Sequence, residues 1–318
     1  MPRRQNSSFF SGTASDGEFL ASFRSPEPQT RRGDIFSFII FHPLFPTLFT
    51  SSVVVAILYM SFLLQGVLSN ALLLIAAFFL GIAVYSLNRI TDLKEDAVNM
   101  PDGGRFFQKN RDYLLFASIE SINIAVVLAF FSNPFAIIVI LSAFSVSVLY
   151  GIGTHRLRLK NILLLKSITV AGTMAATAVV LPFLVDPNVA FIVLMATYFI
   201  FLNIFIEGVL LDVRDIEGDR KAGVRTIPAS LGRKRTRNVL LLMNTTLVVW
   251  VAIALSQPVF YPFIFVFILA VLYGYWSILR FTRASAKISR PSYSLVTGKW
   301  IILALYATPF ALGWVHIL

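Results

Sequence analysis

Apolar stretches about as long as a membrane-spanning helix recur along the chain from residue 35 onward. A transmembrane helix needs roughly 20 consecutive apolar residues. Nine segments approach this length: residues 35–64, 69–87, 113–131, 135–151, 162–183, 189–211, 238–255, 258–279 and 298–317. In lipid, each segment has to satisfy its own backbone hydrogen bonds, which a helix does. The sequence therefore predicts an all-α, polytopic membrane protein with nine transmembrane helices.

The composition supports this class and excludes several kinds of site. The chain is 57% hydrophobic and only 14% charged, which is not typical of a soluble domain. It has no cysteine, so disulfides and thiolate metal sites are excluded. Its three histidines, His42, His155 and His316, lie far apart in the sequence and in no metal-ligand spacing. A metal ion would therefore be held mainly by oxygen ligands.

Residues 1–34 differ from the rest of the chain. They are rich in Ser, Arg and Gly and contain no apolar core segment, which predicts a disordered tail before a membrane domain over residues 35–318. A secretory signal peptide is not expected, because no apolar h-region is present. An organelle transit peptide is the alternative, and four acidic residues weigh against it: Asp16, Glu18, Glu27 and Asp34.

Basic residues are distributed unevenly around the apolar segments. The chain has 27 Lys and Arg and a formal net charge of +11. All of them fall in the tail or in or beside the loops after the second, fourth, sixth and eighth segments. Membrane proteins carry such an excess on the cytoplasmic side. The charge is thus assigned to membrane anchoring, and nucleic-acid binding is not expected because no basic module with interleaved aromatics occurs.

A cluster of acidic residues follows the apolar run 189–211. Asp212, Asp215 and Asp219 are spaced i, i+3, i+7, so they share one face if the helix continues. Carboxylates that converge without partners repel each other and resist ionisation. A divalent cation relieves this repulsion, and Mg²⁺ typically combines one or two carboxylates with substrate phosphates. This segment therefore predicts a site for Mg²⁺ and a phosphorylated ligand.

A second cluster has the same character. Asn88, Asp92 and Asp96 are spaced i, i+4, i+8 at the end of the apolar run 71–87. Each cluster ends the second helix of a four-helix half of the chain, so pseudo-symmetric halves would place the clusters face to face across a central cavity. Mg²⁺ ions held there would neutralise a diphosphate leaving group, so that an allylic C–O bond could ionise. Aromatic faces, with Tyr85 and Tyr150 as candidates, would stabilise the carbocation.

Three segments carry a resemblance to a known family. Residues 88–96 resemble the NxxxDxxxD motif of the UbiA family of intramembrane prenyltransferases, and residues 212–228 resemble its second motif, D-x-E-G-D-x-x-A-G-x-x-T-L-P. The stretch from Tyr150 through Arg158 and Lys160 to Lys166 is similar to the family's Tyr…Arg-x-Lys loop. The resemblance spans residues 35–318. It implies a nine-helix bundle with a central cavity capped by cytoplasmic loops.

Together, the clusters and the resemblance imply a Mg²⁺-dependent prenyltransferase that acts on a polyprenyl diphosphate and a lipophilic acceptor in the lipid bilayer. The expected metal ligands are Asn88, Asp92, Asp96, Asp212, Asp215 and Asp219. Asn88 also belongs to the expected substrate-binding residues, with Tyr150, Arg158, Lys160, Lys221 and Arg225. The expected catalytic residues are Asp92, Asp96, Asp215 and Asp219, with Asp92 or Asp96 as candidate acceptor of the proton released on alkylation.

Several alternatives stay open from the sequence. The acceptor could be an aromatic quinone precursor, a glycerol-phosphate lipid, a porphyrin-type ring or a carotenoid end, and neither prenyl length nor oligomeric state is indicated. An ion-coupled carrier would also explain acids and a repeat, although it predicts acids near the bilayer midplane. A vestigial subunit is disfavoured because all six metal-binding positions are intact. Lys166 lies inside an apolar run, where it would snorkel or pair with Glu120 or Glu207.

The charge distribution yields a topology that can be tested. We expect the N-terminus in the cytoplasm and the C-terminus outside, because nine spans separate them and the basic loops lie on the side of the tail. Both acidic clusters would then face the cytoplasm. Reporter fusions at each terminus measure this directly. Two termini that report from the same side would exclude nine spans.

Overall fold

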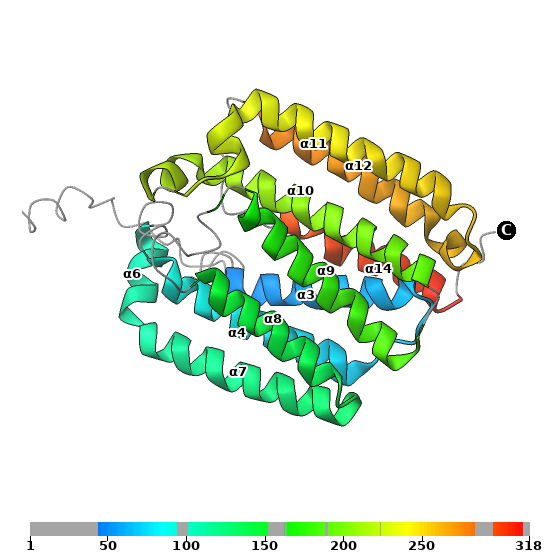
Figure 1. Cartoon of the computed structure of the whole chain (residues 1–318), viewed down its shortest axis with the longest axis horizontal. Coiled ribbons are helices and arrows are strands. Elements are labelled where there is room, and N and C mark those ends of the chain that lie inside the picture. The colour runs from blue at the N-terminus through cyan, green and yellow to red at the C-terminus, as the bar shows by residue number, and fades with distance from the viewer. Residues whose placement is uncertain are drawn as a thin grey trace, which may run out of the picture. The chain divides into compact units, whose positions relative to one another are not determined.

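Helices alone make up the regular structure of the part of the chain that the structure describes (Figure 1). The computed structural model describes residues 44–93, 101–151, 162, 164–187, 190–222, 224–283 and 295–313. The predicted tail, residues 1–34, lies outside these ranges. The first helices are α3 (Phe45–Leu64), α4 (Ala71–Thr91), α6 (Pro101–Lys109), α7 (Arg111–Ser132) and α8 (Ala136–Gly151). The later ones are α9 (Leu165–Val185), α10 (Ala190–Ala222), α11 (Ile227–Ala254), the 3₁₀ helix η2 (Pro258–Phe263), α12 (Ile264–Phe281) and α14 (Lys299–Ala311).

The lengths of these helices confirm the polytopic membrane class. Within the described ranges, seven helical segments are long and apolar enough to cross a bilayer. Two further apolar helices, at residues 136–151 and 295–311, are shorter. The all-α prediction is therefore confirmed for the described residues, whereas the count of nine spans stays a prediction.

Local sequence signals set the ends of several helices. The Asn70 side chain accepts a hydrogen bond from the Leu73 amide at 3.2 Å and so caps α4. Thr226 caps α11 in the same way, with Pro228 in the first turn. Gly232 interrupts α11 with φ of 76°, a left-handed conformation that glycine adopts without steric cost. The kink lies just after the turn that joins α10 to α11.

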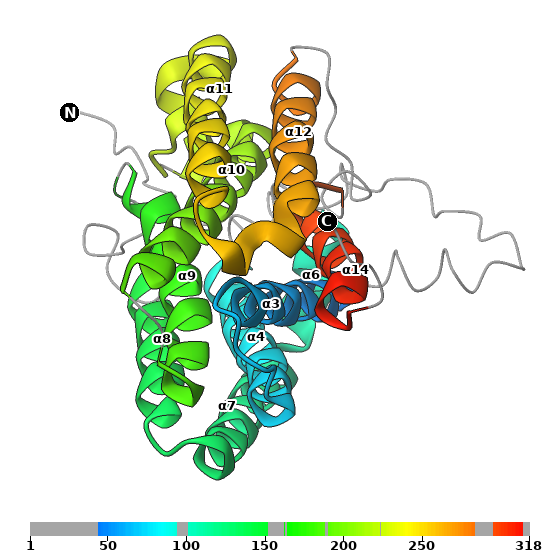
Figure 2. The ribbon, with the colours of Figure 1, turned by 90° about the vertical axis from the view of Figure 1, so that its right-hand side faces the viewer.

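The helices pack around α3, which contacts α4, α9, α10 and α14 (Figure 2). On one side, α4 packs against α7 and α8, with alanines such as Ala76, Ala83 and Ala125 buried at the contacts. Small residues let membrane helices approach closely, which is how such helices gain packing energy in lipid. On the other side, α10 packs against α9 and α11 over a core that includes Phe199 and Trp250.

Helix α10 continues well beyond the apolar run that predicts it. It has 33 residues, of which residues 190–216 form the candidate span. At 1.5 Å per residue the helix is about 50 Å long, against roughly 30 Å for the hydrocarbon core of a bilayer. The helix thus includes Asp212, Asp215 and Asp219. Their shared face was predicted on the condition that the helix continues past residue 211, and it does.

A buried ion pair fastens α10 to α14. Lys299 Nζ lies 2.8 Å from Glu207 Oε1 and donates to Asn203 Oδ1 at 2.8 Å. The Trp300 indole donates to Glu207 Oε2 at 3.2 Å. Only 3% of Lys299 and 6% of Glu207 is exposed. The distribution of basic residues along the sequence had assigned Lys299, with the other Lys and Arg, to membrane anchoring on the cytoplasmic side. In the structure it is the first residue of α14, and its side chain is buried.

Breaking this pair on one side should be costly. Lys299→Met would leave the Glu207 carboxylate buried without its counter-ion, and we expect a loss of about 3–5 kcal/mol in the free energy of unfolding. The double variant with Glu207→Gln should recover most of that loss, because no unpaired charge remains and the new side-chain amide can still contact Trp300. Denaturation in detergent micelles measures both. Equal losses in the single and double variants would contradict an ion-pair contribution.

Candidate functional site

The end of α4 carries two polar residues of the first predicted cluster. Asp92 caps the helix, and its amide donates to the Asn88 carbonyl at 2.9 Å. The Thr91 hydroxyl lies 3.0 Å from Asp92 Oδ1 and donates to it. Asn88 Oδ1 is buried and has no hydrogen-bond partner among the described residues. The third member, Asp96, lies outside the described residues.

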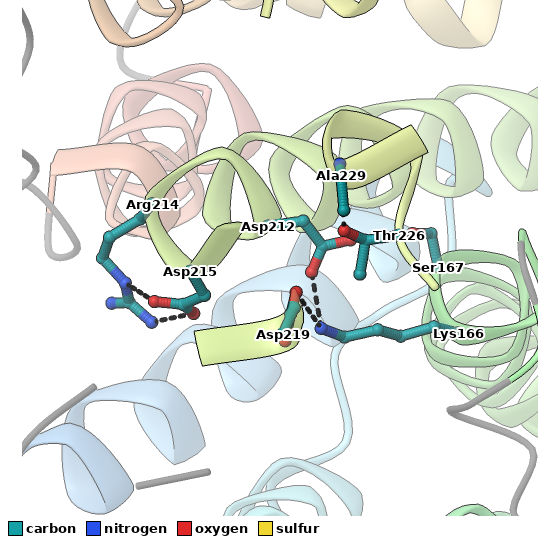
Figure 3. Close-up of polar contacts among 8 residues, drawn as sticks. All are labelled: Lys166, Ser167, Asp212, Arg214, Asp215, Asp219, Thr226 and Ala229. Atoms are coloured by element: carbon teal, nitrogen blue, oxygen red, sulfur yellow. Dashed lines mark hydrogen bonds and ion pairs between the residues drawn. The ribbon is translucent and has the colours of Figure 1, made fainter. Parts of the chain in front are cut away.

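On α10, two of the three predicted carboxylates share one cation. Lys166 of α9 places its Nζ 2.7 Å from Asp212 Oδ1 and 3.4 Å from Asp219 Oδ2 (Figure 3). The Ser167 hydroxyl approaches Asp212 Oδ2 at 3.5 Å. Asp212 and Asp219 are each only 4% exposed. The i, i+7 spacing thus brings these two carboxylates to the same ammonium group.

Asp215 is oriented differently. Arg214 Nε donates to Asp215 Oδ1 and Arg214 Nη2 to Asp215 Oδ2, both at 2.6 Å. Figure 3 shows this pair turned away from Lys166. The Asp215 carboxylate nevertheless remains within electrostatic range of Asp219. The predicted common face therefore brings Asp212 and Asp219 together, while Asp215 is held at its edge by a bidentate arginine contact.

Tyr150 connects the two clusters. It lies buried at the end of α8, and its phenol interacts electrostatically with Asp92 from α4 as well as with Asp212 and Asp219 from α10. The neighbouring Gly151 permits this approach, because a Cβ there would lie 2.8 Å from Thr91 Oγ1. Side chains of both predicted clusters thus lie within electrostatic range of one tyrosine.

The charge at the site is only partly compensated. Burial is the main reason that the pKa of Asp219 is raised to about 6; the carboxylates of Asp212 and Asp215 add to the rise, while the Lys166 ammonium opposes it. One ammonium group therefore serves two buried carboxylates. Such a site favours the arrival of additional positive charge.

A cavity of about 250 Å³ opens beside these residues, between α3, α4, α8 and α9. Asn88, Asp92, Tyr85 and Tyr150 line its polar end. Its other walls are largely apolar and include Val54, Ile57, Leu80, Val146, Met174 and Leu181. Along α9 the lining extends from Thr169 to Leu181, which corresponds to about 18 Å of helix. An elongated apolar pocket with convergent polar groups at one end is a typical ligand site.

Several predicted residues are not placed in this site. Asp96, Arg158 and Lys160 lie outside the described residues, and the side chain of Lys221, within α10, is not described either. Arg225 is exposed in the turn between α10 and α11. Their predicted roles stay predictions.

Other residues of the site were missed from the sequence. The partners of Lys166 are Asp212 and Asp219, not Glu120 or Glu207, and the role of Arg214 at Asp215 was not foreseen. A useful signal existed, because the apolar runs and their ends hold few cations and a buried carboxylate needs one. Matching two lysines to their acids still requires knowing which helices are neighbours.

The donor set fits a hard divalent cation, although the described residues do not present a ready metal site. Among them, no three His, Asp or Glu side chains are grouped to bind a metal ion. Lys166 and Arg214 hold the α10 carboxylates instead. The available donors are nonetheless carboxylate and amide oxygens, which suit Mg²⁺. The buried, unpartnered Asn88 Oδ1 is a further oxygen of this kind.

Comparisons with known proteins agree with the fold and the motifs. The model of the UbiA prenyltransferase family matches residues 44–294, which include both motif segments. The fold is similar to that of a UbiA homologue from Aeropyrum pernix K1, with a TM-score of 0.63 and 16% identity, covering 81% of this chain and 96% of that one. No curated protein matches the chain significantly.

Two further solved structures are similar. A UbiA homologue from Archaeoglobus fulgidus, bound to GPP and Mg²⁺, matches with a TM-score of 0.63 and 15% identity, covering 85% of this chain and 98% of that one. A structure described as concerning digeranylgeranylglyceryl phosphate synthase in membranes matches with a TM-score of 0.57 and 17% identity, covering 84% and 94%. Identities this low establish a common fold.

Proposed function

The chain belongs to the UbiA prenyltransferase family, and we propose that it transfers a polyprenyl group from an allylic diphosphate to a lipophilic acceptor, with Mg²⁺ as cofactor. One observation carries the proposal: Asn88, Asp92 and Tyr150 line the polar end of an apolar cavity, and Tyr150 is also within electrostatic range of Asp212 and Asp219 on α10. A polyprenyl diphosphate has the same division into a charged head and an apolar chain. The likeness to structures bound to GPP or DMAPP and Mg²⁺ supports this assignment.

The carboxylates and amide at the cavity mouth would hold the metal. Asn88 and Asp92 from α4 and Asp212 and Asp219 from α10 supply the oxygens, with Asp215 at the edge and Asp96 as a further candidate. Bound Mg²⁺ would neutralise charge that develops on the departing diphosphate. These charge-assisted contacts become stronger as the leaving group becomes more negative in the transition state. Contacts that are stronger in the transition state than in the ground state accelerate ionisation.

The cavity walls would protect the reactive carbon. When the allylic C–O bond breaks, its electron pair leaves with the diphosphate and a carbocation remains. The apolar side chains along α3, α4, α8 and α9 exclude water, which would otherwise capture it. Tyr85 and Tyr150 line the polar end of the cavity, and their ring faces would stabilise positive charge there. The acceptor then forms the new bond, and its proton passes to Asp92 or Asp96.

The clamp can be tested by removing one carboxylate from each helix. We expect Asp92→Asn and Asp215→Asn each to lower turnover by about 100-fold or more. Both substitutions keep the side-chain volume, and the Arg214 pair is partly exposed, so the stability should change by less than about 1 kcal/mol. Product formation from a panel of prenyl diphosphates and acceptors gives the turnover, and melting curves give the stability.

Two controls sharpen this experiment. Asp186→Asn removes an exposed carboxylate at the opposite end of α9 and should keep full activity. The double variant at Asp92 and Asp215 should be little worse than either single one, because residues that act as a unit are not additive. If no prenylated product forms with any donor and acceptor, even from the unaltered protein, an ion-coupled carrier is favoured instead. Full activity in either single variant would remove that residue from the site.

The cavity should also limit the length of the prenyl chain. Thr177→Phe places a ring in the lining of the deep half of the cavity, so kcat/KM should fall more for long donors than for short ones. Val180→Phe is the matched control, because Val180 lies on the same helix, is 38% exposed and does not line the cavity. Rates with donors of increasing length measure the effect. An unchanged length preference in folded Thr177→Phe protein would place the chain elsewhere.

A further inference from the structure

Lys166 occupies a position that the proposed chemistry assigns to a metal. Its ammonium group lies between Asp212 and Asp219, which are the carboxylates expected to bind Mg²⁺ (Figure 3). Two buried carboxylates side by side are unfavourable without positive charge between them. The single ammonium therefore reduces the repulsion between the two carboxylates, as a divalent cation would do more fully. The ammonium and the metal ion cannot occupy this position at the same time.

The buried pair of Lys299 and Glu207, which also involves α10, provides a comparison. There, one ammonium faces one carboxylate, and Asn203 and Trp300 complete the hydrogen bonds. At Lys166, one ammonium faces two carboxylates, so a negative charge remains uncompensated. The side chain of Lys166 is 21% exposed, whereas that of Lys299 is 4% exposed. The charges of the Lys299 pair are therefore matched and shielded from solvent. At Lys166 the ammonium is partly accessible and one negative charge is left over, so a divalent cation could replace the ammonium.

The location of Lys166 favours a move toward a phosphate. The residue lies in the first turn of α9, where the helix dipole attracts anions and disfavours cations. Thr169 and Val170, in the next turn, line the cavity that would hold the prenyl chain. A lysine ammonium on its flexible four-carbon stem can shift by several ångströms, and it binds phosphate oxygens as a point charge.

On the proposed function, we infer that Lys166 is an exchangeable counter-ion. Without metal, its ammonium holds Asp212 and Asp219 together. When a divalent cation takes these carboxylates, the ammonium is repelled and contacts the diphosphate. Lys166 thereby positions the metal ligands in one state and binds the leaving group in the other.

The inference predicts opposite changes in two binding constants for Lys166→Met. Affinity for Mn²⁺ alone should rise by about tenfold, because a competing cation is removed. Affinity for inorganic pyrophosphate at saturating Mn²⁺ should fall by about tenfold or more, because a charge-assisted contact is lost. Paramagnetic resonance of free Mn²⁺ and calorimetry with pyrophosphate measure these on protein purified in detergent. The metal-free variant should also melt at a lower temperature and recover on addition of Mn²⁺.

Lys299→Met is the matched control, because Lys299 also pairs with a carboxylate of α10 but lies outside the site. It should leave both affinities unchanged, and adding Mn²⁺ should raise its lowered melting temperature by no more than it raises that of the unaltered protein. Lys166→Arg keeps the charge and covers the case in which Lys166→Met does not fold. Since its fork can hold carboxylates in two contacts, Mn²⁺ should bind no more tightly than to the unaltered protein.

The outcomes separate this inference from the proposed function. If the unaltered protein binds pyrophosphate with Mn²⁺ but Lys166→Met leaves both affinities unchanged, Lys166 is only structural and the inference fails. Tighter Mn²⁺ binding by folded Lys166→Arg would also overturn it. If the unaltered protein shows no Mn²⁺-dependent binding of pyrophosphate, the proposed function itself fails.

Discussion

Ionised side chains inside a helical membrane bundle have to find partners, because water cannot solvate them there. In this protein the requirement falls mainly on α10, which carries Glu207, Asp212 and Asp219 in its buried face. Lys299 from α14 and Lys166 from α9 supply the positive charge from two different sides. These ion pairs connect α10 to α14 and to α9. The proposed site depends on the charges at Asp212 and Asp219, since α10 contributes half of the predicted metal ligands.

The opposite half of the site is positioned by close packing instead. Gly151 brings the end of α8 against Thr91, and this contact places Tyr150 beside Asp92. Small residues such as Gly81, where a Cβ would lie 2.8 Å from Ser51 Cα, hold α3 close to α4. The cavity lies between helices assembled in this way. Ion pairs therefore hold the α10 side of the proposed site, and close packing positions its α4 and α8 side.

The sequence predicts the class of the protein well and the internal contacts poorly. Apolar runs near bilayer length and two long motifs identify an all-α membrane protein of the UbiA family, and the described helices and the family match confirm both. The continuation of the helix through Asp219 is also confirmed. By contrast, the partner of Lys166 and the burial of Lys299 depend on which helices become neighbours, and periodicity along one segment carries no such information. Asp215 pairs with Arg214 because of a side-chain rotamer, which spacing alone does not determine.

The length of α10 sets the depth at which the site lies. Its candidate span ends at Ile216, so Asp212 falls in the last turns of that span and Asp219 follows it. The cavity, in contrast, extends along α9 from Thr169 to Leu181, away from the helix end that carries Lys166. A lipid-anchored diphosphate could keep its head group at the level of the phospholipid head groups and its chain at the level of their acyl tails. Extraction from the bilayer, which would cost about 0.8 kcal/mol for each methylene group, is then unnecessary. Substrates would reach the protein by lateral diffusion in two dimensions.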